Sequence, residues 1–188
     1  MKREARYLKG NPRMVFDYPW TEEERSKYVD MYVDTDWGAD EIARKSTSAG
    51  ALMRGTEKNA VTLTFYSVTQ ATPSLSSGEA EFKGITKGLI EALFMKNFAE
   101  RFGDKVTIRI HSDSTAALGM CRRLGTGKRV KHIEIPYFFI QQVVNEGQVV
   151  LCKVATEVNP ADIGTKYLSG TRLKELLQLM NCKTMPAG

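Results

Sequence analysis

The stretch that decides the fold is Tyr28-Val29-Asp30-Met31-Tyr32-Val33-Asp34, in which apolar and polar residues alternate over much of the length. Alternation with a period of two predicts a β-strand with one face in a core, here the face of Val29, Met31 and Val33. Residues 47–54 and 60–67 predict two further strands. Because short connections join these three strands, we expect them to be antiparallel neighbours.

A long helix follows the three strands. Ser76-Ser77-Gly78-Glu79 is a capping box, and the helix that it opens is predicted to run to about residue 101 and to end at Gly103. Residues 106–112 and 148–154 predict a fourth and a fifth strand, and further helices are predicted at about 115–124, 133–145, from 160 and at 171–179. This order predicts an α/β fold with one five-stranded mixed sheet, three antiparallel strands first, flanked by helices.

The two ends of the chain lie outside this pattern. Residues 3–9 predict the last turns of a helix that Gly10-Asn11-Pro12 stops, and because no capping residue precedes it we expect the natural protein to extend upstream. Residues 12–27 predict an irregular connector that holds Glu22-Glu23-Glu24. We therefore expect three segments: 1–27 as an upstream tail and connector, 28–168 as the main domain, and 169–188 as a C-terminal helix and tail.

Composition places the chain among globular proteins. It has 188 residues, of which 42% are hydrophobic and 26% charged, which argues against intrinsic disorder. No apolar run approaches the roughly 20 residues of a membrane span, and no apolar core follows the basic N-terminus, so we expect neither a membrane partner nor a secretory signal. Three cysteines, Cys121, Cys152 and Cys182, stand far apart in no metal-ligand spacing, which indicates reduced thiols.

The excess of positive charge is local. The chain has 27 basic and 22 acidic residues, a net charge of +5, and no acidic residue stands between Asp113 and Glu134. That interval holds five basic residues, equal to the whole excess: Arg122, Arg123, Lys128, Arg129 and Lys131. A solvated face is the ordinary explanation, and contact with a phosphate backbone is the functional one.

Three aspartates stand at the ends or starts of predicted elements. Asp34 ends the first strand and Asp113 the fourth, and strand ends are where α/β sheets present functional side chains. Asp162 follows Asn159-Pro160-Ala161 at the opening of a predicted helix. For each aspartate taken singly, a turn, a helix cap or a favourable interaction with the helix dipole is the alternative.

Glu81 is more informative, because it shares a face of the long helix with small and apolar residues. That face holds Ile85, Gly88, Leu89 and Ala92. A buried glutamate there is unfavourable unless it is paired or binds a metal. The alternative is that Phe82 and Leu93 mark the true centre of the apolar stripe.

Together the four acids suggest a cluster of oxygen ligands for hard divalent cations such as Mg²⁺. Two such ions, about 3.5–4 Å apart, hold the attacking water and the leaving oxygen in a phosphoryl displacement. Carboxylates placed that close repel one another without a cation. Spacing alone leaves this cluster a hypothesis.

Six segments, in order, resemble the ribonuclease H domain of copia-type LTR retrotransposon polyproteins and cover about residues 28–168. They are Tyr32-Val33-Asp34-Thr35-Asp36-Trp37, Arg44-Lys45-Ser46-Thr47-Ser48, Leu75-Ser76-Ser77-Gly78-Glu79-Ala80-Glu81-Phe82, Ser112-Asp113-Ser114 with Ala116 and Ala117, Lys131-His132-Ile133-Glu134-Ile135 with Tyr137 and Phe139-Ile140, and Asn159-Pro160-Ala161-Asp162-Ile163-Gly164-Thr165-Lys166. Arg6-Tyr7-Leu8-Lys9-Gly10 resembles the tail of the reverse transcriptase region that precedes this domain.

The resemblance implies the ribonuclease H fold and hydrolysis of the RNA strand of an RNA–DNA hybrid with two Mg²⁺ ions, for which Mn²⁺ is a substitute. The metal-binding and catalytic acids carry over to Asp34, Glu81, Asp113 and Asp162, with Asp36 the competing choice to Asp34. The family implies one ion between Asp34 and Asp162 and a second shared by Asp34, Glu81 and Asp113.

The implied partners are an RNA–DNA hybrid and the upstream reverse transcriptase domain of the same polyprotein, within the cell. Candidate contacts with the nucleic acid strands are Arg44, Lys45, Ser46, Thr47 and Ser76, with the five bases between Asp113 and Glu134 holding the duplex. Many cellular ribonucleases H carry a mobile histidine before the last acid, and residues 155–159 have none, which implies slower turnover. Two alternatives stay open: a hybrid-binding module that does not cleave, and an integrase-like strand transferase.

Overall fold

A computed structural model describes residues 2–11, 13–19, 26–40, 42–56, 59–123 and 134–185. The core of this part of the chain is a five-stranded sheet in the order β4-β3-β2-β5-β6. The strands are β2 (Tyr28–Asp36), β3 (Thr47–Arg54), β4 (Val61–Thr69), β5 (Thr107–Ser112) and β6 (Val149–Lys153). β2, β3 and β4 are antiparallel, while β5 is parallel to β2 and to β6, so the predicted mixed sheet is confirmed.

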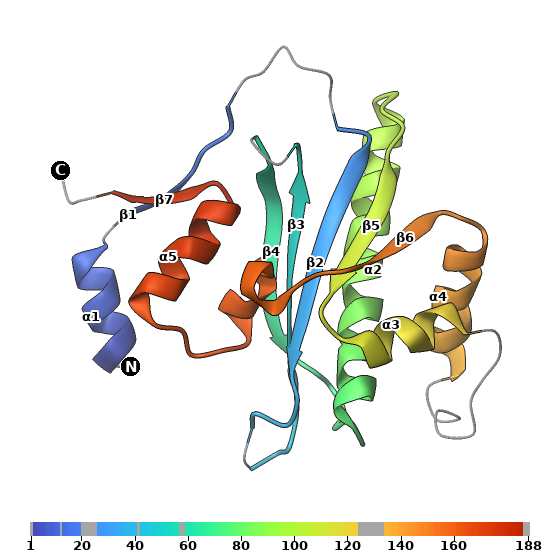
Figure 1. The fold of residues 1–188 in the computed structure, drawn as a ribbon, viewed down its shortest axis with the longest axis horizontal. Coiled ribbons are helices and arrows are strands. Elements are labelled where there is room, and N and C mark those ends of the chain that lie inside the picture. Colours follow the sequence, from blue (N-terminus) through green and yellow to red (C-terminus); the bar gives the residue numbers. More distant parts are fainter. Residues whose placement is uncertain are drawn as a thin grey trace.

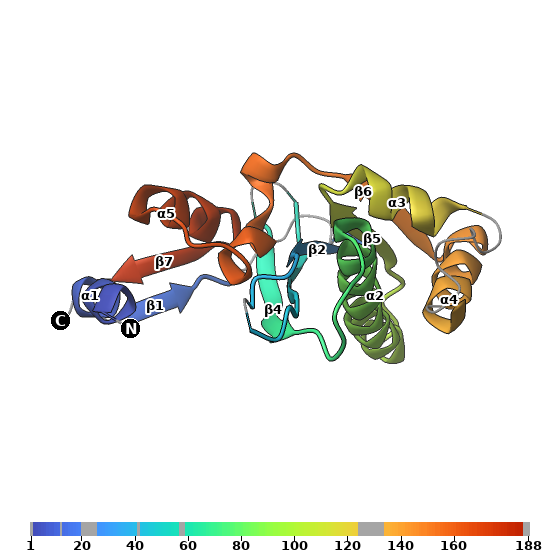
Figure 2. The same ribbon diagram turned by 90° about the horizontal axis from the view of Figure 1, so that it is seen from below.

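One face of the sheet is covered by α2 (Ser77–Arg101), against which α3 (Thr115–Arg122) and α4 (Glu134–Asn145) pack (Figures 1 and 2). The predicted buried face of α2 is confirmed, since Ile85, Gly88, Leu89 and Ala92 are all buried. They lie over Val29, Met31 and Val33, which are fully buried as their alternation predicts.

Two glycines bring α2 unusually close to β2. A Cβ atom at Gly88 would lie 2.5 Å from Val33 Cγ1, and one at Gly84 would lie 2.4 Å from Thr35 Oγ1. Real Cβ atoms essentially never come that close, so only glycine allows this helix to sit so low on the strand. The close approach fixes the height of the first turns of α2 above the end of β2.

The opposite face carries the segment after β6 and a second, smaller core (Figure 2). The segment consists of η2 (Thr156–Val158), η3 (Pro160–Gly164) and α5 (Gly170–Leu179). The helix predicted from residue 160 is a single 3₁₀ turn, capped by Asn159 and left by the chain at Thr165. A Cβ at Gly164 would lie 2.5 Å from that of Ala49, so this turn also packs tightly on the sheet.

The ends of the chain correct one prediction. After α1 (Lys2–Gly10), residues 13–16 form β1 (Arg13–Phe16), which pairs antiparallel with β7 (Cys182–Met185), so the prediction of an irregular connector was wrong there. All four side chains of β1 are exposed, so burial imposes no alternation on the sequence. The strand forms by pairing with residues at the other end of the chain, which local sequence does not reveal (Figure 1). Glu22-Glu23-Glu24 lies outside the described residues.

The three cysteines are free thiols, and burial raises the pKa of Cys121 to about 12. Thiols are unreactive when protonated, which fits a packing role for Cys121. Within the described ranges, no helix is long and apolar enough to cross a membrane.

Candidate metal centre

Adjacent parallel strands bring two of the predicted acids to one end of the sheet. β2 pairs in parallel with β5, so their carboxyl ends point the same way. Asp34 stands near the end of β2 and is 2% exposed, and Asp113 directly follows β5. Carboxyl ends of neighbouring strands are where this class of sheet places ligand-binding side chains.

The start of α2 delivers a third acid to the same place. The Ser76 hydroxyl caps the helix by accepting from the Glu79 backbone N–H at 3.2 Å, as predicted. Glu79 reaches back one residue further than the capping box predicts and accepts from the Leu75 N–H at 3.0 Å. With the helix start fixed and Gly84 seated on Thr35, carboxylate oxygens of Asp34, Glu81 and Asp113 lie within 4.8 Å of one another. We call these three residues the acid triad.

Asp162 approaches the triad from the other face of the sheet. The Asn159 side chain is fully buried, donates to the Val33 carbonyl oxygen at 3.0 Å and accepts from the Ala161 N–H at 3.2 Å. These bonds fasten η3 to β2 one residue before Asp34. Asp162, which is 3% exposed, is thereby held beside Asp34, although it is not one of the three acids that meet within 4.8 Å.

Lys166 connects the two halves of the site. Its Nζ lies 2.7 Å from Asp162 Oδ1 and 3.4 Å from each carboxylate oxygen of Asp34. The neighbouring Thr165 hydroxyl also donates to Asp34 Oδ2. Both residues stand in the last of the six motifs, but the sequence pattern indicates no role for them. The available signal was the spacing of four between Asp162 and Lys166, which brings opposite charges together on a helical turn.

Asp113 is held by the segment after β6. Its Oδ2 accepts from the Thr156 hydroxyl at 2.7 Å, and its backbone oxygen accepts from Lys153 Nζ. Neither residue was predicted, because the contacts join parts of the chain some 40 residues apart. Asp36, the competing choice in the first motif, ends β2 opposite Thr47 and is not part of the acid triad.

Negative charge exceeds positive charge at this site. Burial and the charges of Asp34 and Asp113 raise the pKa of Glu81 to about 8, against smaller opposing effects of Lys166 and the Thr35 N–H. Burial also raises the pKa of Asp162, although the hydrogen bond from Lys166 lowers it in part. Glu81 Oε2 is buried without a hydrogen-bond partner among the described residues.

These features fit a divalent cation. Three converging carboxylates offer the oxygen ligands that Mg²⁺ prefers, and an ion there would relieve both their repulsion and the unpartnered Glu81 oxygen. The carboxylates fit Mg²⁺ or Mn²⁺ better than softer metals, which prefer thiolate or imidazole ligands.

The predicted nucleic acid contacts differ in how exposed they are. Arg44 is exposed in the loop after β2, and Arg122 and Arg123 are exposed at the end of α3, where the Arg122 guanidinium donates to the Leu151 carbonyl oxygen at 2.9 Å. The loop after β2 and the start of α3 lie at the same end of the sheet (Figure 1). Lys45 and Thr47 are half-buried, and Ser76 is occupied as the cap of α2. Lys128, Arg129 and Lys131 lie outside the described residues.

Ser46 has a different role from the one predicted. It is fully buried, and its hydroxyl accepts from the Gly38 N–H at 3.2 Å, which closes the loop between β2 and β3. A fully buried side chain has no surface to offer to a duplex, so its burial argues against a direct nucleic acid contact of Ser46.

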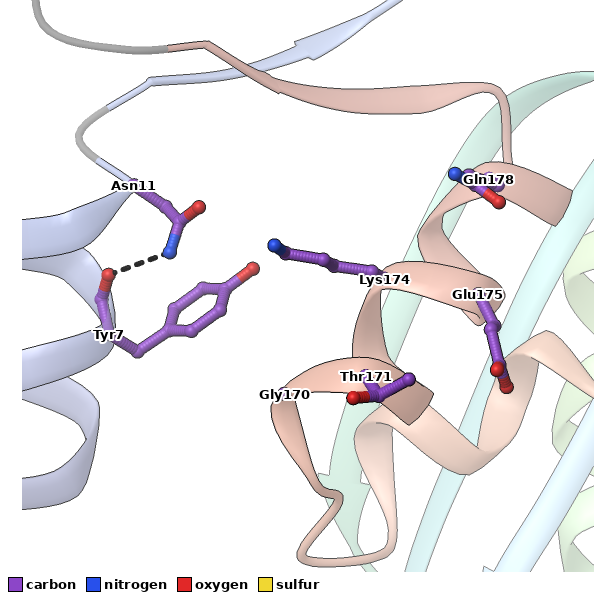
Figure 3. A pocket seen from close by; sticks show the side chains of 7 residues that line it. All are labelled: Tyr7, Asn11, Gly170, Thr171, Lys174, Glu175 and Gln178. Carbon is purple, nitrogen blue, oxygen red and sulfur yellow. Dashed lines mark hydrogen bonds between the residues drawn. The ribbon is translucent and has the colours of Figure 1, made fainter.

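A pocket of about 690 Å³ lies elsewhere, between α1 and α5 (Figure 3). Tyr7 of α1 and Lys174 of α5 face each other across it, and none of the four acids lines it. The pocket therefore belongs to the junction between the two ends of the chain and not to the metal centre.

No family model matches the chain. The retrovirus-related Pol polyprotein from transposon TNT 1-94 of Nicotiana tabacum is 27% identical over 150 residues, which are 79% of this chain and 11% of that polyprotein. The corresponding polyprotein from transposon RE1 of Arabidopsis thaliana is 26% identical over 188 residues, 99% of this chain and 12% of the polyprotein. The chain thus spans only about a tenth of the length of these relatives.

Solved structures share the fold at low identity. The N-terminal RNase H domain of a Mycobacterium tuberculosis protein superposes with a TM-score of 0.51 at 15% identity, covering 81% of this chain and 98% of that one. LC11-RNase H1, isolated from compost, gives a TM-score of 0.50 at 15% identity, covering 80% and 93%. With its sheet order and its relatives, this chain is an RNase H-like domain homologous to the Pol polyproteins of copia-type retrotransposons.

Proposed function

We propose that this domain is a metal-dependent endonuclease that hydrolyses the RNA strand of RNA–DNA hybrids during reverse transcription of a retrotransposon. The observation that carries the proposal is the acid triad: three carboxylates within 4.8 Å at adjoining strand ends, on an RNase H-like sheet. Structural acids are normally paired with bases, whereas these three are grouped with each other.

Each acid has a proposed part in the chemistry. Asp34 is central, because it belongs to the acid triad and also contacts Lys166, which pairs with Asp162. Glu81 and Asp113 complete one proposed ion site with it, and Asp162 completes the other. When bound there, Mg²⁺ ions supply positive charge at the scissile phosphate and a lowered pKa for a coordinated water. Thr156 and Thr165 hold the carboxylates of Asp113 and Asp34 in their orientation.

Recognition of the hybrid is proposed to depend on backbone and shape. Arg44 in the loop after β2 and Arg123 after α3 have exposed side chains suited to phosphates on either strand, while the exposed Arg122 also donates to the Leu151 carbonyl oxygen. A ribonuclease also needs contacts to 2′-hydroxyls, which carry no base information. We therefore expect cleavage with little sequence preference and binding that weakens as salt rises.

The proposed covalent partner is an upstream reverse transcriptase domain. Its tail corresponds to α1, and β1 and β7 join that N-terminal segment to the end of the chain. The relatives are Pol polyproteins about seven to eight times as long as this chain, which matches only 11–12% of their length.

The test is a cleavage assay of the purified chain with an end-labelled RNA–DNA hybrid, with Mg²⁺ or with excess EDTA. We expect internal cuts in the RNA strand with Mg²⁺, none with EDTA, and none with Asp113→Asn, which should still bind the hybrid in a gel-shift assay. Binding without cleavage by the wild-type chain would instead support a non-catalytic hybrid-binding module.

A further inference from the structure

Lys166 lies where the proposed function requires a divalent cation, and this inference rests on that function. The ion proposed between Asp34 and Asp162 would need oxygens that already surround an ammonium group. We propose that Lys166 is a positioning residue that holds Asp34 and Asp162 together and competes with the divalent cation for their oxygens.

The geometry of the ammonium supports competition. Nζ lies 2.7 Å from Asp162 Oδ1 and 3.4 Å from both oxygens of Asp34, so a single cation spans two carboxylates that are almost fully buried. Mg²⁺ binds oxygen at about 2.1 Å, close enough that it and an ammonium cannot share the same lone pairs in the same space. The Lys166 side chain is 39% exposed, so it has room to swing outward when an ion enters.

Among the described residues, Glu81 and Asp113 have no lysine between them as Lys166 lies between Asp34 and Asp162. Glu81 Oε2 lacks a partner there, and Lys153 reaches only the backbone oxygen of Asp113. The two proposed ion positions therefore differ: Lys166 contacts only Asp34 of the triad, whereas at the second position it contacts both acids, Asp34 and Asp162. A first divalent ion should bind at the triad, and a second should bind only as Lys166 leaves the pair.

Lys166 also differs from two lysines that form ion pairs at the surface. Lys183 contacts Asp17 at 2.8 Å, with both side chains largely exposed, and Lys87 contacts Glu91 on the surface of α2. Lys183→Met removes the same charge as Lys166→Met, at the β1–β7 sheet and away from the acids. It is the matched control for any general effect of net charge.

The experiment measures divalent ion binding by the whole chain, without substrate. Mn²⁺ titrations followed by electron paramagnetic resonance or calorimetry give the number of bound ions, and thermal unfolding gives the rise in midpoint with Mg²⁺. For Lys166→Met we expect a lower midpoint without metal, a larger rise with Mg²⁺, and a second Mn²⁺ bound about tenfold more tightly than in the wild type, because one competing positive charge is gone. Lys183→Met should behave as the wild type.

Equal or weaker Mn²⁺ binding by Lys166→Met would overturn the inference. Lys166→Gln, which keeps a donor but no charge, repeats the test if the first variant unfolds. Failure of both variants to fold at any Mg²⁺ concentration would also overturn it, because divalent ions should replace the missing ammonium. If the wild type binds Mn²⁺ and cleaves the hybrid, and Lys166→Met binds Mn²⁺ no more tightly, this inference fails and the proposed function stands. If the wild type neither binds Mn²⁺ nor cleaves the hybrid, both the inference and the proposed function fail.

Discussion

Asp30 and Asp34 are buried carboxylates on the same strand, four residues apart, in opposite electrostatic surroundings. Asp30 is 6% exposed and accepts two hydrogen bonds from Arg109, at 2.6 and 2.8 Å, and one from His111 Nε2 at 2.7 Å. Burial raises its pKa, but these bonds from His111 and Arg109 outweigh burial and leave the pKa below its ordinary value. Asp34 is 2% exposed and faces two further acids across the triad.

The difference separates a structural carboxylate from a candidate functional one. Around Asp30 the chain supplies its own neutralising partners, and the Arg109 guanidinium also stacks 4.2 Å from the Tyr28 ring centroid. Around Asp34 the acids outnumber the bases, and the pKa of Glu81 is raised to about 8. Burial alone therefore does not mark a metal site; a cluster that leaves negative charge uncompensated does.

Asp34→Asn should give the largest effect. Removing the carboxylate shared by both proposed ion positions should lower hybrid cleavage by about a thousandfold or more, in line with the loss of a central group that stabilises transition-state charge. Because the change also removes repulsion from the triad, the midpoint of thermal unfolding without metal should stay the same or rise. Cleavage is measured under single-turnover conditions and unfolding by circular dichroism. A large fall in the midpoint would contradict the picture of repelling acids.

The pH dependence of Mg²⁺ binding should be the next largest effect. The folded-state pKa of Glu81, about 8, lies above its ordinary value of 4.5, so the unfolded chain releases this proton first. Stability of the metal-free protein should then fall from about pH 4.5 to about pH 8 and level off above. Mg²⁺ requires the ionised form, so its affinity should rise roughly tenfold per pH unit up to about pH 8.

Calorimetry at several pH values in two buffers checks this, since it also counts the proton released on binding. Glu81→Gln is the matched variant, in which the steep dependence should disappear. A flat affinity between pH 6 and 8 in the wild type would show that Glu81 is already ionised before metal binds.

Asp30→Asn should have effects opposite to those expected of Asp34→Asn: a loss of stability with little change in cleavage. We expect a loss of about 2 kcal/mol in the free energy of unfolding, below the 3–5 kcal/mol typical of a fully buried pair because Arg109 is one-third exposed. Because the pKa of Asp30 is lowered, this contribution should be present above its ordinary pKa of 3.8 and be lost as pH falls through the folded-state pKa. Denaturant unfolding at pH 7 and pH 3 measures it, and cleavage should stay within about twofold. Loss of cleavage in a folded Asp30→Asn would place Asp30 in the functional site.

Local patterns predicted most of the sheet and the three acids of the triad. The bounds predicted for the second strand, 47–54, are those of β3, and Ser76 caps α2 as its spacing indicates, because both signals come from neighbours in sequence. Glu81 was identified because it departs from an apolar helical face, an irregularity that sequence displays directly. Asp162 was a candidate from its place at a predicted helix start, and the resemblance to the family supported the same residue.

The remaining contacts arise from tertiary structure. Lys166 reaches Asp34 only because Asn159 ties η3 to Val33, and a 3₁₀ turn, rather than the α-helix predicted, sets the direction of that side chain. Ser46 was predicted to contact a nucleic acid strand, and it lies in the same motif as Arg44 and Lys45. In the structure the loop turns its hydroxyl inward, where it accepts from the Gly38 N–H. β1 and β7 pair across the whole length of the chain; β1 has no buried face to reveal it, and β7 buries only Cys182 fully.

His111→Gln should give the smallest effect and tests whether the two regions are independent. His111 contributes one hydrogen bond to Asp30 and stacks on Tyr32 with ring centroids 4.4 Å apart, while Arg109 keeps its two bonds. We expect a loss of about 1 kcal/mol in the free energy of unfolding, mostly from the lost stacking. Equilibrium unfolding of the single variant and of the double variant with Asp30→Asn gives the coupling between the two residues. Since Arg109 alone still neutralises Asp30, Mg²⁺ affinity and cleavage should not change; a shift in either would mean that charge at the Asp30 end of β2 reaches the acids at the other end.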